Sequence, residues 1–179
     1  MMPILKQMKL QPDRRGFVCA FLLLFAFLGT AVPLSAQTIL LVIQETAGGQ
    51  PLTAPLPIRE ALAARLFDAG LIVFDLPGVM PAAGVTEISR LARTAGADVI
   101  LEVQADYTDT LAGGTTRIAA HVTWNLIATA TGTAIANGAR DGSNSGHERE
   151  MDRGALGATL AAPIAEDVGS ALAARVPPA

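Results

Sequence analysis

Two segments in the middle of the chain place apolar residues at every second position. In residues 98–106 the apolar positions are Val99, Leu101, Val103 and Ala105. In residues 117–128 they are Ile118, Ala120, Val122, Trp124, Leu126 and Ala128. Alternation with period two is typical of a strand with one face in the core and the other in solvent. We therefore expect these segments to be neighbouring strands of a sheet with one polar face.

Other strands are indicated by shorter apolar runs. Residues 38–44 are almost continuously apolar, which favours a central strand covered on both faces. A second short strand is expected at 71–75. A last strand is expected at 133–140, weakened by Gly138 and followed by a polar loop at 141–146. Residues 107–115, which contain Gly113 and Gly114, are predicted to be a hairpin loop.

Apolar residues at helical spacing predict three helical segments. The first begins at Pro57 and ends before Gly70, with apolar positions Ile58, Leu62, Leu66 and Ala69. The second is capped by Thr86 and ends at Gly96, with apolar positions Val85, Ile88, Leu91, Ala92 and Ala95. The third covers 149–175, with apolar positions Leu156, Leu160, Ile164, Val168 and Leu172. Pro163 predicts either a kink or a division into two helices there.

The predicted order of elements is β-α-β-α-β-β-β-α. Residues 37–179 contain no internal repeat and no low-complexity linker. The fold class that follows is α+β, as one domain with a mixed sheet and helices packed against it.

Residues 1–36 have the features of a secretory signal peptide. Lys6, Lys9, Arg14 and Arg15 precede a short apolar stretch at 17–28, and the small residues Ser35 and Ala36 follow. We predict cleavage after Ala36 and a periplasmic location. If it were uncleaved, this segment would be a membrane anchor and the chain's only membrane contact. Cys19 lies at the start of the apolar stretch, whereas a lipid-bearing cysteine would lie at its end.

Composition excludes several classes of protein. The chain has 179 residues, a net charge of −3 and one cysteine. Without residues 1–36 it keeps 143 residues, a net charge of −6 and no cysteine. The negative charge argues against a nucleic-acid binder, which needs a basic face. The absence of cysteine from 37–179 excludes a disulfide framework and a cysteine zinc site there.

Several segments of the sequence resemble those of a known group of domains. They are residues 39–43, residues 58–70 leading into 71–75, residues 91–98 leading into 99–103, and residues 124–132. In this order they resemble the domain shared by the curli secretion channel subunit CsgG, the lipoprotein activators of penicillin-binding proteins and the N-terminal domain of TolB. The most diagnostic segment for this resemblance is the junction at which a helix leads through Gly96-Ala97-Asp98 into a strand.

The resemblance implies an envelope protein that binds other proteins or assembles into rings, without a catalytic site. The lipid-bearing cysteine of the channel subunit and the activators is missing. We also expect neither the membrane-inserted hairpins of a secretion pore nor the propeller of TolB. No functional residue is therefore carried over from these families.

One segment has the outline of a calcium loop. Residues 141–152 place oxygen-bearing side chains at positions 1, 3, 5 and 12 and glycine at position 6; these residues are Asp141, Ser143, Ser145, Asp152 and Gly146. The serines are neutral, and position 12 is Asp where a bidentate Glu is usual. We therefore favour a solvated loop followed by the start of a helix.

Candidate catalytic residues are few. His121 and His147 are the two histidines, and His147 has Ser143, Ser145 and Glu148 nearby in sequence. A hydrolase also needs a rigid nucleophile elbow and an oxyanion hole, which no motif supplies. Glu102 and Asp106 share a strand face but would lie ~13 Å apart, too far for paired carboxylate catalysis. Trp124 shares the apolar face of its strand and is predicted to belong to the core.

These observations predict no catalytic, cofactor-binding or metal-binding residue. The favoured function is a periplasmic, non-enzymatic domain that binds protein partners in envelope assembly or transport. The alternative is a self-assembling subunit of an envelope ring or secretion apparatus, and a less favoured one is a cell-wall hydrolase. For partner contact we expect the open edge strand and the loops at 47–57 and 76–84.

Overall fold

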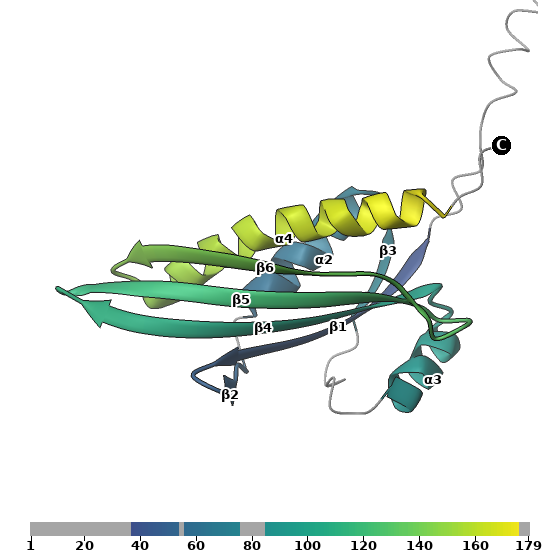
Figure 1. Cartoon of the computed structure of the whole chain (residues 1–179), viewed down its shortest axis with the longest axis horizontal. Coiled ribbons are helices and arrows are strands. Elements are labelled where there is room, and N and C mark those ends of the chain that lie inside the picture. The colour runs from purple at the N-terminus through teal and green to yellow at the C-terminus, as the bar shows by residue number, and fades with distance from the viewer. Residues whose placement is uncertain (1–36, 54–55, 76–84, 176–179) are drawn as a thin grey trace, which may run out of the picture. The chain divides into compact units, whose positions relative to one another are not determined.

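The computed structural model describes residues 37–53, 56–75 and 85–175. The elements in order are β1 (Thr38–Ala47), β2 (Gln50–Pro51), α2 (Pro57–Asp68), β3 (Ile72–Asp75), α3 (Val85–Ala95), β4 (Val99–Ala112), β5 (Thr115–Ala128), β6 (Ala134–Gly146) and α4 (Arg149–Ala173). The described residues thus form a single α+β domain with a six-stranded mixed sheet and three helices (Figure 1). The predicted fold class is confirmed, and the two-residue strand β2 is the only addition to the predicted order.

The sheet joins a parallel half to an antiparallel half. Its order is β2-β1-β4-β5-β6, and β3 pairs with the start of β1 on the same side as β2. β1 is parallel to β3 and β4, whereas β4, β5 and β6 form an antiparallel meander. β1 is therefore a central strand, as its continuous apolar run predicts.

Helices α2 and α4 cover one face of this sheet and form the main core (Figure 1). The predicted apolar positions Ile58, Leu62 and Leu66 of α2 are fully buried. All five predicted apolar positions of α4 are also buried. They pack against the inward residues of the alternating strands, among them Leu101 and Trp124.

Helix α3 covers only one end of the opposite face (Figure 1). Its buried residues Ile88 and Ala92 pack on Leu40, Val42, Ile100 and Ile127, which belong to β1, β4 and β5 near that end. Among the described residues, no element covers the remainder of this face, where the polar positions of β4, β5 and β6 lie.

The hairpin between β4 and β5 is longer than predicted. β4 continues through Tyr107 to Ala112, and each residue to that point pairs with β5. The expected loop at 107–115 is therefore wrong except for its tip, where Gly113 and Gly114 take positive φ angles of 59° and 81°. Tyr107 lies in the covered face and is buried, so burial of its ring favours continuation of the strand.

The predicted polar loop at 141–146 is also wrong, because β6 continues to Gly146. Its pairing with β5 runs without interruption from Leu126↔Ala136 to Thr116↔Gly146. Small residues are needed here because α4 packs closely on this strand. A Cβ at Gly142 would lie 2.9 Å from Leu156 of α4. Tertiary packing thus overrides the loop preference of a Gly- and Ser-rich segment.

Helix α4 is one helix from Arg149 to Ala173 with Pro163 inside it. Of the two outcomes expected at Pro163, the division into two helices is wrong. None of the helices in the described part of the chain has the length and apolar character needed to cross a membrane. The predicted signal segment at 1–36 and the predicted contact loop at 76–84 lie outside the described residues.

Candidate functional site

The uncovered part of the sheet presents a polar surface, which we call the open face. It arises because the inward positions of β4, β5 and β6 are occupied by core residues, so the alternate positions point to the other side. Its members are Glu102, Gln104, Asp106, Thr108, Arg117, His121, Thr123, Asn125, Asp141 and Ser143. The alternation of residues 98–106 and 117–128 predicts one polar face, and the structure confirms it. His121 lies on this face with its side chain about half exposed.

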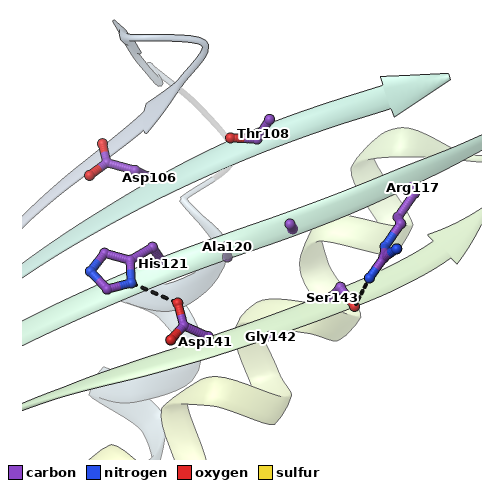
Figure 2. A pocket seen from close by; sticks show the side chains of 9 residues that line it. Asp106, Thr108, Arg117, Ala120, His121, Asp141, Gly142 and Ser143 are labelled. Atoms are coloured by element: carbon purple, nitrogen blue, oxygen red, sulfur yellow. Dashed lines mark hydrogen bonds and ion pairs between the residues drawn. The ribbon is translucent and has the colours of Figure 1, made fainter.

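A row of polar residues crosses four strands of the sheet. The strand register places Thr46, Asp106, His121 and Asp141 opposite one another in sequence from β1 to β6. The hydroxyl of Thr46 donates a hydrogen bond to Asp106. His121 Nδ1 lies 2.7 Å from Asp141 Oδ1 (Figure 2). Backbone pairing alone brings these residues together, although they are up to 95 positions apart in the sequence.

The open face contains two shallow hollows. The first is lined by Asp106, Thr108, Arg117, His121, Asp141 and Ser143, and an Arg117 guanidinium nitrogen lies 3.4 Å from Ser143 Oγ (Figure 2). The second is lined by Glu102, Gln104, Thr123 and Asn125. Partial burial raises the pKa of Glu102. The open face is therefore broad, weakly concave and rich in both hydrogen-bond donors and hydrogen-bond acceptors.

The groups around His121 are acidic on both sides. The residues directly opposite His121 on its two neighbouring strands are both carboxylates, Asp106 and Asp141. Ser143 accepts from Arg117, and the His121 side chain is about half exposed (54 %). A serine nucleophile needs a hydrogen bond to its base and a nearby oxyanion hole. His147 and Glu148 are exposed residues between β6 and α4, away from this row.

The calcium pattern at 141–152 does not form a loop. Asp141, Ser143 and Ser145 belong to β6 and point to the open face. Asp152 belongs to α4 on the covered side, where a Cβ at Gly146 would meet its carboxylate. These oxygens therefore point to opposite sides of the sheet. Among the described residues, no three His, Cys, Asp or Glu side chains are grouped as metal ligands.

A buried carboxylate in the covered face was not predicted from the sequence. Glu45 is 3 % exposed and accepts hydrogen bonds from the backbone N–H groups of Ile58 (3.3 Å) and Arg59 (2.9 Å). The hydroxyl of Tyr107 donates a third, at 3.1 Å. Glu45 thus caps the start of α2, where Leu56 has no capping side chain. Burial raises the pKa of Glu45 in spite of these hydrogen bonds.

The same cluster also binds the first turns of α4 to β4. The guanidinium of Arg153 lies 5.9 Å from the centre of the Tyr107 ring. Arg153 is also 2.5 Å from Asp109, and Arg149 is 3.3 Å from the same oxygen. Burial and the neighbouring Glu45 raise the pKa of Tyr107. One feature of the sequence could have predicted this cluster. Every second residue of β1 points into the core, as Ile39, Leu41 and Ile43 do, and Glu45 is the next residue in that series.

Comparison with known proteins identifies the fold but no family. No family model matches the sequence, and no curated protein matches it either. Among solved structures, the dodecamer of a PelC point variant from Paraburkholderia phytofirmans matches with a TM-score of 0.52 and 17 % identity, over 73 % of this chain and 90 % of that one. The hypothetical protein CT253 from Chlamydia trachomatis matches with a TM-score of 0.58 and 14 % identity, over 79 % and 100 %. Protein XCC0632 from Xanthomonas campestris matches with a TM-score of 0.52 and 7 % identity, over 77 % and 86 %.

At these identities the matches establish a shared fold and nothing finer. They span nearly the whole of the matched chains, so the similarity concerns an entire domain. This chain therefore adopts a domain fold that occurs in several bacterial proteins, including one that crystallised as a dodecamer.

Proposed function

We propose that this protein is a periplasmic, non-catalytic domain that binds protein partners of the cell envelope through its open face. The observation that carries the proposal is the uncovered polar surface of β4, β5 and β6, which lies opposite a fully packed core. Polar, accessible groups on a rigid sheet suit recognition of another protein, because the side chains are held in place by backbone pairing.

Location in the envelope rests on the predicted signal peptide at 1–36 and on the resemblance to envelope domains. The bacterial origin of the matched folds is compatible with both. The open face is more acidic than basic, since it carries Glu102, Asp106 and Asp141 against Arg117 and His121. A partner with exposed basic and amide groups would complement it.

Site-specific crosslinking in the native host tests this proposal. A photoreactive amino acid at Thr123 lies in the open face, and the same amino acid at Ala158 lies on the exposed side of α4. We expect a discrete crosslinked partner from position 123 that is absent from position 158. Thr108→Lys should remove that product, because the variant adds a charge to the open face without touching the core. Equal products from both positions, or no effect of Thr108→Lys, would contradict the proposal.

A second candidate function is self-assembly into an envelope ring. The observation that favours it is the PelC match, because that structure is a dodecamer with the same fold. Sedimentation of the exported protein distinguishes the candidates: a mass of six or more chains supports a ring, whereas a monomer excludes it. The hydrolase alternative receives no support from the groups around His121, which are carboxylates and a guanidinium-bonded serine.

A further inference from the structure

The outer edge of β6 is an unpaired strand edge of unusual length. Among the described residues, β6 pairs only with β5, so its other side has no strand partner. It is 13 residues long, contains neither proline nor lysine, and carries only two charged side chains, Arg140 and Asp141. Soluble proteins protect exposed edges with short strands, prolines, lysines or bulges, because a long free edge pairs with other chains. The one irregularity lies near the start of β6, beside Leu126 and Ile127, and leaves the rest of the edge regular.

Two side-chain contacts show which backbone groups point outward. Arg140 donates from its guanidinium to the carbonyl of Ala139 at 3.0 Å. The N–H of Ser145 donates to the side-chain oxygen of Asn144 at 2.8 Å. An N–H group has a single hydrogen to donate, so that of Ser145 is not bonded to β5. Because outward and inward residues alternate along an antiparallel strand, the odd-numbered residues of this segment present their N–H and C=O groups to the free edge.

We propose that β6 pairs with β6 of a second copy of this chain, antiparallel and centred on Gly142. This register places Asp141 opposite Ser143 of the second copy, and Ala139 opposite Ser145. All of these residues are odd-numbered, so each opposite pair exchanges two backbone hydrogen bonds. The pairing therefore adds about eight backbone hydrogen bonds across the two-fold axis.

The side chains of β6 disfavour the two registers centred nearer the start of the strand. The register centred on Asp141 would place two Asp141 carboxylates directly opposite each other, and the one centred on Arg140 would oppose two guanidinium groups; directly opposed like charges destabilise a sheet. The register centred on Ser143 opposes no like charges, but it places Ala139 opposite His147, beyond the end of β6, and so forms fewer backbone pairs. In the register centred on Gly142, Asp141 lies opposite Ser143 of the second copy, and the two Gly142 residues lie opposite each other.

The two side chains that now occupy the edge also become complementary. Pairing would use the carbonyl of Ala139 and the N–H of Ser145, so Arg140 and Asn144 would lose these two contacts. Arg140 would keep its ion pair with Asp167 of α4, and Asn144 its hydrogen bond to the carbonyl of Asp152. In the proposed register these two residues lie opposite each other on the covered side, where the guanidinium can donate to the amide oxygen. Each lost contact is thus replaced across the dimer axis.

The part of α4 that packs on Gly142, at the centre of the proposed pairing, is uncharged. Residues 154–165 of α4 carry no charged side chain, so no charge must be desolvated along that stretch. The two-fold axis is perpendicular to the sheet, so the two open faces lie on the same side and form one continuous polar surface. This inference goes beyond the proposed function, because the dimer would form whether or not the open face binds a partner.

The mass of the exported protein in solution tests the dimer. A single edge-to-edge strand pairing is a small interface, so we expect a reversible dimer at high micromolar concentration. Ser143→Pro removes one outward N–H and leaves the bonds to β5 intact, as proline is tolerated on an edge. We expect this variant to sediment as a monomer, while the matched control Ser143→Ala remains dimeric. Circular dichroism of each variant verifies the fold.

Disulfide trapping tests the register without a destabilising change. Residues 37–179 contain no cysteine, so Asp141→Cys and Ser143→Cys chains carrying different tags can be mixed under mild oxidation. The mixed disulfide should form faster than either symmetric one, because residues 141 and 143 are directly opposite. A wild-type monomer at high concentration, a dimer unaffected by Ser143→Pro, or trapping that prefers the symmetric products would each overturn the proposal. A partner captured at position 123 by a monomeric protein would overturn the dimer while leaving the proposed function intact.

Discussion

The indole ring of Trp124 lies over Gly138, its direct neighbour on the adjacent strand. A Cβ at residue 138 would come within 2.8 Å of three atoms of the ring. Glycine in a strand normally weakens the strand, because it has high backbone entropy in the unfolded chain and no side chain to pack. Here its lack of a side chain provides the space in which the tryptophan is buried.

Gly138→Val should therefore destabilise the domain although valine favours strands. We expect a loss of about 1–3 kcal/mol in the free energy of unfolding, because the buried ring must move. Ala139→Val is the matched control, since residue 139 is exposed on the opposite face, and its effect should be small. Chemical denaturation of both variants measures the difference. A Gly138→Val protein as stable as the control would show that the ring moves freely.

The crossing of α2 and α4 depends on Gly157. A Cβ at this position would lie 2.7 Å from Pro57 Cβ and 2.8 Å from its carbonyl carbon. Gly157→Ala should cost about 1–3 kcal/mol, because backbone atoms cannot yield as a side chain can. Gly154→Ala, in the same helix with no atom within 4 Å, should instead stabilise the protein by roughly 0.5–1 kcal/mol. Thermal unfolding that shifts both variants in the same direction would contradict this account.

The buried carboxylate of Glu45 should make stability depend on pH. Its pKa in the folded protein is raised above the ordinary value of 4.5, so the folded state binds this proton more tightly than the unfolded state. The contribution of Glu45 to stability is therefore greatest below pH 4.5 and is lost as the pH rises through the raised pKa.

Glu45→Gln removes the titrating group and keeps the size and shape of the side chain. One carboxylate oxygen becomes an NH2 group, which can donate to the Tyr107 hydroxyl, while the remaining oxygen still accepts from Arg59. We expect the variant to be more stable than wild type at neutral pH, with the difference shrinking toward pH 4.5. Glu45→Ala should cost about 2 kcal/mol or more at every pH, because α2 loses its cap and Tyr107 its acceptor. Denaturation curves across this pH range test both expectations, and a parallel pH profile for Glu45→Gln and wild type would refute the first.

The ion pair of Arg153 with Asp109 should contribute more to stability than that of Arg149. The Arg153 and Asp109 side chains are 15 % and 20 % exposed, whereas Arg149 is 59 % exposed. Removing one partner of a mostly buried pair leaves an uncompensated charge, so Arg153→Ala should cost about 2–4 kcal/mol. Arg149→Ala should cost less than about 1 kcal/mol. The comparison needs only the unfolding free energies of the two variants at low and moderate salt.

Export can be tested directly. The predicted cleavage after Ala36 implies that the protein isolated from the envelope begins at Gln37. N-terminal sequencing of that form verifies the bond. A Met1 terminus in the membrane fraction would indicate an uncleaved anchor instead.

The sequence by itself determined the order of elements and the two faces of the alternating strands. Periods of two and of about four residues are local properties, so they identified Leu101 and Trp124 as inward and His121 as outward before any contact was known. The same local reasoning placed the buried positions of α2 and α4, from Ile58 to Leu172, because a helix buries one face whatever its partner.

Only the tertiary structure decided where β4 and β6 end and what occupies the core beside them. Residues 141–146 have the composition of a loop, and they form a strand because β5 supplies hydrogen bonds along their whole length and α4 covers their glycines. From the sequence alone, a glutamate such as Glu45 would be expected to face solvent. Its hydrogen-bond partners Ile58 and Tyr107 are 13 and 62 positions away in the sequence. Residues so distant meet only when the sheet has formed, because strand register, and not local preference, sets which side chains are neighbours.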